Sequence, residues 1–140
     1  MTIRYGWLIA NQVILTQMEG LIAPAEFRQW ADELNPFYDQ IPFSRLHIII
    51  DAAGLQKTPS IKEMLNIPVH QKRGWILIVG LSDRLLQFLA SMVVQLTHTE
   101  LRFVTTVEEA VEVLQRVDLT LQPFTSVEEM GWVTIATSTP

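Results

Sequence analysis

The first twenty residues contain two short segments rich in β-branched and aromatic side chains. These are Ile3–Ala10 and Val13–Glu19, and Asn11-Gln12 lies between them. The pattern predicts two strands joined by a tight turn, as an antiparallel hairpin. We expect Gly20 to end the second strand, because glycine commonly interrupts a strand.

The next segment carries apolar residues with the period of a helix. Pro24 suits the first helical turn, because the N–H that proline lacks has no partner there in any case. The apolar residues recur three and four positions apart, on one side of the expected helix: Phe27, Trp30, Ala31, Leu34, Phe37 and Tyr38. Pro36 falls inside this pattern, so we expect the helix to break or kink near Leu34.

Two continuous apolar runs follow, Leu46–Ile50 and Trp75–Val79. Runs without polar alternation are typical of strands that are covered on both faces, as in parallel sheets. The first run is expected to end at Asp51 and to lead into a loop, Ala52–Pro59. A short further strand is expected at Leu101–Val104.

Helices are expected between and after these strands. Ser60 and Glu63 fit a capping box at the start of a short helix. The stretch 85–96 has a wide apolar face when it is drawn as a helix. Thr106 and Glu109 fit a second capping box before a last helix. The apolar side of that helix is formed by Val107, Ala110, Val111, Leu114 and Val117.

Strands that alternate with helices favour an α/β fold with a mixed, mostly parallel sheet and right-handed crossovers. The N-terminal β-hairpin adds an antiparallel edge, and about four helices are expected. Residues 1–118 then form one α/β domain, and residues 119–140 form a C-terminal extension. Three placements of the extension stay open: it folds back on the domain, adds a strand, or binds a neighbouring subunit.

Composition and charge narrow the class of protein. The chain has 140 residues, no cysteine and a formal net charge of −5. The lack of cysteine excludes disulfides, thiolate metal sites and cysteine nucleophiles, and it fits a cytoplasmic location. The nearest approach to a basic cluster is the pair Lys72-Arg73, so nucleic acid is not expected as a partner. No apolar run reaches the roughly 18 residues of a membrane helix, so no membrane insertion is expected.

Few residues suggest chemistry. His47, His70 and His98 share no metal-ligand spacing, so we expect no metal site. His47 lies in an apolar run, where a histidine held by a hydrogen bond is expected. The sequence has no nucleophile elbow and no phosphate-binding glycine loop, so neither enzymatic activity nor a cofactor is expected. Asp51 ends a central strand, where ligands bind in open α/β sheets, although an aspartate there also serves as a turn anchor.

The centre of the chain resembles a known family. Leu46–Leu55, followed by Pro59–Lys62, is similar to the centre of STAS domains, which sulfate transporters and bacterial anti-sigma-factor antagonists share. The flanking segments 19–21, 74–80 and 102–110 are similar as well, and the resemblance covers roughly residues 3–117. The greatest similarity is to the STAS-like proteins grouped with the CRAL-TRIO lipid-binding fold.

This resemblance implies a binding switch. In antagonist STAS proteins a kinase phosphorylates a serine at the start of the helix after the third strand, and the unmodified form binds an anti-sigma kinase. Ser60 falls at or next to that position. On this resemblance, the candidates for phosphorylation or partner binding are Ser60, Thr58, Asp51 and Lys62. The family's Asp-Ser-Ser-Gly is here Pro59–Lys62, and a plain N-cap role for Ser60 stays open.

Two functions therefore stay open. The first is a non-enzymatic, STAS-like regulatory or protein-binding module, similar to anti-sigma-factor antagonists. Its partner is another protein or a second copy of the chain in a homodimer. The alternative is a carrier for a lipid or another apolar small molecule, which the CRAL-TRIO similarity implies. A carrier is expected to have an apolar cavity beneath the helix at 85–96.

Overall fold

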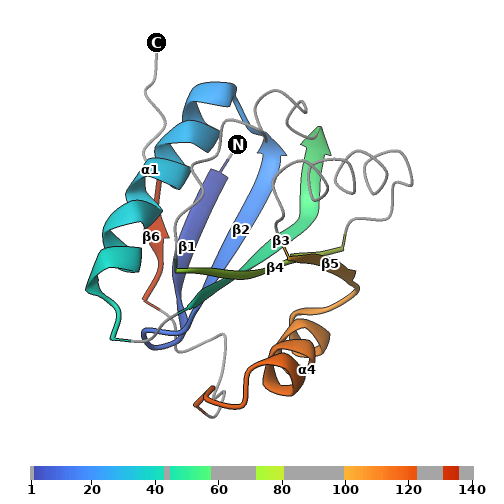
Figure 1. Cartoon of the computed structure of the whole chain (residues 1–140). Helices are drawn as coiled ribbons and strands as arrows, with labels where there is room; N and C mark the ends of the chain where they lie inside the picture. The colour runs from blue at the N-terminus through green and yellow to red at the C-terminus, as the bar shows by residue number, and fades with distance from the viewer. Residues whose placement is uncertain (1, 43–44, 58–71, 81–99, 123–130, 136–140) are drawn as a thin grey trace.

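The computed structural model describes residues 2–42, 45–57, 72–80, 100–122 and 131–135. Within them, six strands form one mixed sheet in the order β5-β4-β3-β2-β1-β6, and two helices pack on it (Figure 1). The strands are β1 (Thr2–Ile9), β2 (Val13–Leu21), β3 (Leu46–Lys57), β4 (Arg73–Val79), β5 (Leu101–Val104) and β6 (Val133–Thr134). The helices are α1 (Pro24–Gln40) and α4 (Val107–Val117). The expected α/β fold with a mixed sheet is thus confirmed, whereas the helices expected after Ser60 and at 85–96 lie outside the described residues.

The centre of the sheet is parallel. β2, β3, β4 and β5 pair in parallel, and β1 pairs with β2 in the opposite direction. Ile48 and Ile49 are successive residues of β3 that face opposite sides of the sheet, and both are buried. The continuous apolar run therefore belongs to a strand covered on both faces, as expected. Figure 1 also shows that β4 and β5 are strongly turned relative to β1 and β2, which is the usual twist of a sheet.

The hairpin does not form an edge of the sheet, which corrects the expectation. β6 pairs in antiparallel fashion with Arg4 and Tyr5, on the side of β1 that faces away from β2. The N–H of Ile135 then donates to the carbonyl of Ile3 at 2.8 Å, and the Ile135 side chain is buried. The C-terminal extension thus folds back and adds a strand, in agreement with two of its three open placements.

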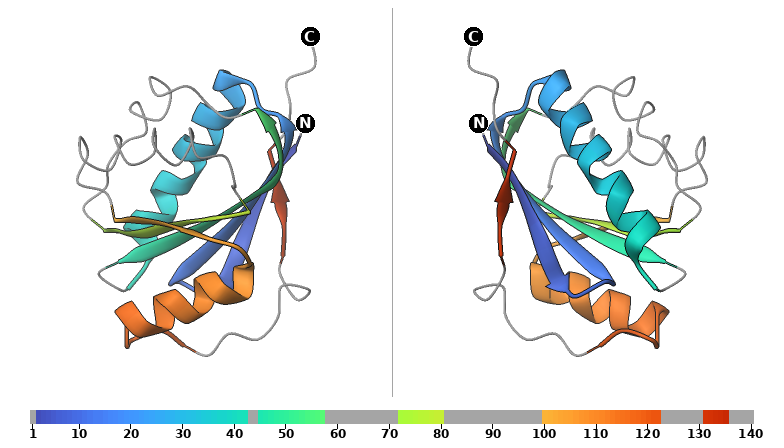
Figure 2. Two further views of the ribbon diagram at one scale, coloured as in Figure 1. Left: turned by 90° about the vertical axis from the view of Figure 1, so that its right-hand side faces the viewer. Right: turned by 90° about the vertical axis from the view of Figure 1, so that its left-hand side faces the viewer.

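The two helices cover opposite faces of the sheet (Figure 2). Successive side chains of β2 point to opposite sides, so that Ile14 joins the core beneath α1 and Leu15 joins the core beneath α4. We call these sides the α1 face and the α4 face. The helical residues buried on the α1 face are Phe27, Trp30, Ala31, Leu34 and Tyr38, and those on the α4 face are Ala110, Val111, Val113 and Leu114.

Helix α1 runs through Pro36 to Gln40, so the expected break near Leu34 is wrong. Pro36 is exposed, and its ring removes only the hydrogen bond to the carbonyl of Asp32. Leu34 and Tyr38 flank the proline and are 3% and 5% exposed. Burial of such side chains contributes about 1.5–3 kcal/mol each. Packing on both sides of the proline therefore offsets the loss of the backbone hydrogen bond.

Strand β3 is longer than expected. It continues to Lys57, so the expected loop from Ala52 onward is wrong as far as the structure describes it. Strand β2 also continues past Gly20, and its last residues pair with Gly54, Leu55 and Lys57 through two shifts of register. Such bulges interrupt the alternation of side chains, and a strand of this kind is not visible as a regular period in the sequence.

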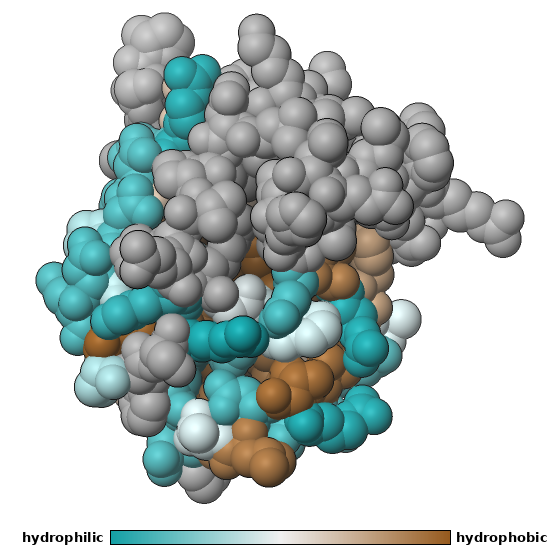
Figure 3. Space-filling model, viewed as in Figure 1, coloured by the Kyte–Doolittle hydropathy of each residue, from teal (hydrophilic) through white to brown (hydrophobic). Residues whose placement is uncertain are grey.

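The described surface mixes polar and apolar residues. Figure 3 shows apolar residues in the lower part of the view, in the region of α4. The large apolar side chains that are most exposed at this end are Val117, at 42%, and Leu119, at 91%. No helix in the described part of the chain is long and apolar enough to cross a membrane.

Candidate functional site

The α4 face of the sheet changes character along the strands. Near the start of β2 and β3 it carries Val13, Leu15 and Ile49, which are buried in the core beneath α4. Further along the same two strands it carries Gln17 and Asp51, which pair with each other in the register of the sheet. Because alternate residues of a strand share one face, these polar side chains lie on the same side of the sheet as the apolar ones.

Three polar side chains form a row across β1, β2 and β3. Arg4 Nε donates to Gln17 Oε1 at 2.6 Å, and Gln17 Nε2 lies 3.5 Å from Asp51 Oδ2. Asp51 Oδ1 also accepts a hydrogen bond from the N–H of Ala53 at 3.2 Å. The amide of Gln17 therefore turns its oxygen to the cation and its nitrogen to the carboxylate. We call Arg4, Gln17 and Asp51 the polar row.

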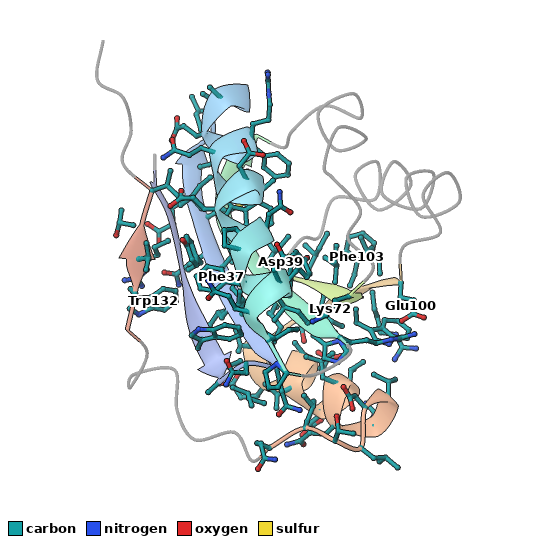
Figure 4. All side chains as sticks on the ribbon, turned by 60° about the vertical axis from the view of Figure 1, so that its left-hand side comes forward. Phe37, Asp39, Lys72, Glu100, Phe103 and Trp132 are labelled. Atoms are coloured by element: carbon teal, nitrogen blue, oxygen red, sulfur yellow. The ribbon has the colours of Figure 1, made fainter. Side chains whose placement is uncertain are left out.

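The C-terminal extension adds an aromatic ring to this row. The guanidinium carbon of Arg4 lies 4.1 Å from the centre of the Trp132 ring. Figure 4 shows Trp132 beside the β6 edge of the sheet, next to β1. A cation over an indole is the most favourable of the cation–π pairs. Arg4 is thus held from two directions, by an amide oxygen and by an aromatic face.

A hollow of about 320 Å³ lies beside the polar row and is lined by Arg4, Gln17, Glu19 and Thr134. Glu19 and Thr134 are exposed, while Arg4 and Gln17 are half-buried. Gly54 lies opposite Glu19 in the register, and a Cβ on this glycine would lie 3.0 Å from Glu19 Cγ. The hollow therefore combines one cation, one carboxylate, an amide and a hydroxyl group.

Comparisons with known proteins do not place the chain in a family. No protein-family model matches it, and no curated protein is similar to it in sequence.

Of the four site residues expected from the sequence, the structure describes only Asp51. Asp51 lies in the polar row, inside β3 and not at its end as expected, and it accepts a hydrogen bond from the Ala53 N–H. Thr58, Ser60 and Lys62 lie outside the described residues, as does the helix whose underside would hold an apolar cavity.

Arg4, Gln17 and Trp132 were not expected at the site. Their signal in the sequence is weak, because it depends on the register of the hairpin. A regular hairpin around Asn11-Gln12 would pair Arg4 with Glu19. Because Ile9 pairs with Val13, the turn is one residue longer than expected, and an irregularity between Trp7 and Ile9 shifts the register by one more residue, so that Arg4 pairs with Gln17 instead. Trp132 reaches Arg4 only because β6 pairs with β1, a contact between the two ends of the chain.

A second polar group lies at the opposite end of the sheet, and it is structural. His47 is 1% exposed, its Nδ1 accepts the N–H of Trp75 at 3.0 Å, and its Nε2 lies 2.7 Å from Asp118 Oδ2. Because Nδ1 accepts a hydrogen bond, the ring proton is on Nε2, and Nε2–H donates a hydrogen bond to the Asp118 carboxylate. Both ring nitrogens are therefore occupied. The expectation of a histidine held by hydrogen bonds is confirmed.

Asp118 links this histidine to the C-terminal extension. Its Oδ1 accepts from the N–H and the hydroxyl group of Thr120, at 2.9 Å and 2.5 Å. Partial burial alone would raise the pKa of Asp118, but the hydrogen bonds from Thr120 and His47 outweigh it and hold the pKa below its usual value. The carboxylate is thus kept ionised as the C-cap of α4.

Gln12 completes the structural group. It is 1% exposed, its Nε2 donates to the Thr120 carbonyl at 2.9 Å, and its Oε1 accepts the Gln122 N–H at 2.8 Å. Among the described residues, no three histidine, aspartate or glutamate side chains are grouped to hold a metal ion. The polar row and its hollow are accordingly the candidate functional site.

Proposed function

We propose that the chain is a non-enzymatic, STAS-like binding module whose contact surface is the polar part of the α4 face. The observation that carries the proposal is the change along β2 and β3 from buried apolar residues to the polar row and the exposed Glu19. In open α/β sheets, ligands and partners bind beyond the carboxyl ends of the parallel strands. β2 and β3 are such strands. Glu19 lies near the carboxyl end of β2, and Asp51 lies level with Val79, the last residue of β4.

The charges of this surface favour a protein partner. The chain carries a net charge of −5, and two of its carboxylates, Glu19 and Asp51, lie on this face. Carboxylates and amides at a protein surface give orientation and specificity to protein contacts more than bulk affinity. The resemblance of Leu46–Leu55 to STAS domains supports an anti-sigma kinase or a related protein as the partner. On this proposal, Ser60 and Lys62 belong to the same contact region.

The test is binding to the purified histidine-kinase-like domain of an anti-sigma factor from the same source, measured by isothermal titration calorimetry. Asp51→Lys and Glu19→Lys are expected to weaken binding at least about tenfold, because each places a cation on the contact surface. Glu108→Lys changes the same charge on the exposed side of α4 and is expected to leave the affinity unchanged. A wild-type chain that shows no heat of binding, or lysine variants that bind as wild type, would contradict the proposal.

A further inference from the structure

We infer that the hollow beside the polar row binds a small zwitterion, a molecule with a carboxylate and an ammonium group on one short carbon skeleton. The amino acids L-alanine and β-alanine are two small members of this class. The inference rests on the hollow alone and does not depend on the proposed protein partner.

The guanidinium of Arg4 is the group that would bind the carboxylate of the ligand. Its Nε is bonded to Gln17 and one face of the group is covered by Trp132. Within the part of the chain that the structure describes, no protein acceptor is bonded to its two Nη groups. Those two nitrogens form the planar edge that binds carboxylates with two parallel hydrogen bonds. Arg4 is therefore oriented in advance, and little side-chain freedom is lost on binding.

The carboxylate of Glu19 is the group that would bind the ammonium group of the ligand. On the strand β2 it is two residues beyond Gln17, and Gln17 is the direct neighbour of Arg4. Side chains in this diagonal relation lie roughly 7–8 Å apart on one face of a sheet. Because Gly54 opposite has no side chain, Glu19 lies across β3 with its Cγ against the glycine. The arrangement places a cation and an anion at the two ends of one small hollow.

The balance of charge selects the class of ligand. Arg4 contributes one positive charge and Glu19 one negative charge to the lining, and Asp51 adds a second carboxylate behind Gln17. A simple anion would meet the carboxylate of Glu19, and a simple cation would meet Arg4, so each is disfavoured. A molecule that carries both charges satisfies Arg4 and Glu19 together, and Thr134 lines the same hollow.

The size of the hollow agrees with this class. Ligand pockets range from about 300 to 1,000 Å³, and a hollow of about 320 Å³ is near the lower limit. It therefore suits a molecule of amino-acid size.

The experiment is an NMR titration of the full chain with L-alanine, β-alanine, sodium acetate and methylammonium chloride, each added separately. The probes are the indole N–H of Trp132 and the side-chain amide of Gln17, which lie at the site. We expect saturable shifts of both signals with at least one of the two amino acids. Acetate and methylammonium are expected to bind at least about tenfold more weakly, because each lacks one charge-assisted hydrogen-bonding group.

Variants separate this site from a general effect of charge. Arg4→Gln and Glu19→Gln are each expected to weaken amino-acid binding at least about tenfold. Arg102→Gln is the matched control, because Arg102 also lies over a tryptophan, Trp75, at 5.9 Å, but on β5. It is expected to leave binding unchanged.

Three results would overturn the inference. The first is the absence of shifts with both amino acids at about 100 mM, a concentration far above any specific affinity. The second is acetate or methylammonium that binds as tightly as the amino acid. The third is undiminished binding by Arg4→Gln or Glu19→Gln in spectra that otherwise match the wild type. Since no protein partner is present in the titration, these results leave the test of the contact surface untouched.

Discussion

At the scale of single residues, His47 decides how the start of the sheet is packed. Its imidazole lies between β4 and α4, where it accepts from the Trp75 N–H and donates to Asp118. The fit depends on Gly74, because a Cβ there would lie 2.3 Å from His47 Nδ1. A buried polar side chain without its partners costs roughly 1–3 kcal/mol, so both sides of the ring are sensitive to substitution.

Gly74→Ala is expected to lower the free energy of unfolding by about 2 kcal/mol or more, because the new methyl group displaces His47 from its hydrogen bonds. The measurement is urea denaturation at pH 7. Gly131→Ala is the matched control, since a Cβ at Gly131 meets nothing within 4 Å. The control is expected to change the free energy by no more than about 0.5 kcal/mol. Equal effects of the two variants would contradict this account of Gly74.

Asp118 makes stability depend on pH in a defined direction. Its pKa in the folded chain is lowered, whereas an unfolded aspartate has a pKa of about 3.9. Its stabilising effect is therefore present in full above the unfolded pKa and is lost as the pH falls through the folded pKa. Asp118→Asn is expected to reduce stability by about 1–2 kcal/mol at pH 7.

The difference between wild type and Asp118→Asn is expected to narrow as the pH falls below about 4. Denaturant midpoints measured between pH 3 and pH 7 check this. Asp32→Asn, on the exposed side of α1, serves as the control for a general change of charge. A difference that stays constant over this pH range would show that the ionised carboxylate of Asp118 is not what stabilises the fold.

At the scale of elements, irregular positions decide where the functional side chains lie. The longer turn and the irregularity between Trp7 and Ile9 together move Arg4 from a position opposite Glu19 to one opposite Gln17. The register shift between Gln17 and Glu19 sets Gly54 opposite Glu19, and pairing of β2 with β3 continues beyond it. A one-residue shift turns side chains to the other face, so these bulges determine which charges meet in the hollow.

Pro36 is the corresponding irregularity of α1. Pro36→Ala is expected to raise the free energy of unfolding by about 1–3 kcal/mol, because it restores the N–H that can donate to the Asp32 carbonyl. Thermal unfolding followed by circular dichroism measures the gain. Gln29→Ala, on the exposed side of the same helix, tests propensity alone and is expected to change little. A lower melting temperature for Pro36→Ala would mean that the proline helps to shape the helix.

At the scale of the whole molecule, the C-terminal extension completes the sheet and the candidate site. β6 covers the outer edge of β1, Ile135 enters the core beneath α1, and Trp132 covers Arg4. Thr120 and Gln122 are bonded to Gln12 near the turn of the hairpin. The extension is therefore attached to the sheet at both of its described ends.

Ile135→Ala is expected to cost about 2–4 kcal/mol of stability, because the side chain is 2% exposed and its loss leaves a cavity. Val133→Ala is the matched control in the same segment, since Val133 is 44% exposed, and it is expected to cost less than about 1 kcal/mol. Denaturant unfolding of both variants measures the difference. If Ile135→Ala were as mild as the control, the extension would not be part of the cooperative core.

The sequence by itself determined the elements whose signals are local. Continuous apolar runs marked β3 and β4 as buried parallel strands, since no face of such a strand needs polar residues. Thr106 started α4 as expected, with its hydroxyl group accepting the Glu109 N–H, although the Glu109 carboxylate binds Thr105 instead of closing the capping box. The end of β3 was not predicted: the apolar run stops before Asp51, but the strand continues to Lys57.

Only the tertiary structure decided the features that depend on distant contacts. Packing of Leu34 and Tyr38 on the sheet keeps α1 continuous through Pro36. The free energy of this packing comes from contacts with other elements, so the local sequence pattern does not reveal it. The pairing of β6 with β1 joins residues more than one hundred positions apart, and it brings Trp132 to Arg4. The register shifts determine which residues lie opposite Glu19 and Gln17. The candidate site is built from these contacts, because a strand period identifies a face but not the register that fills it.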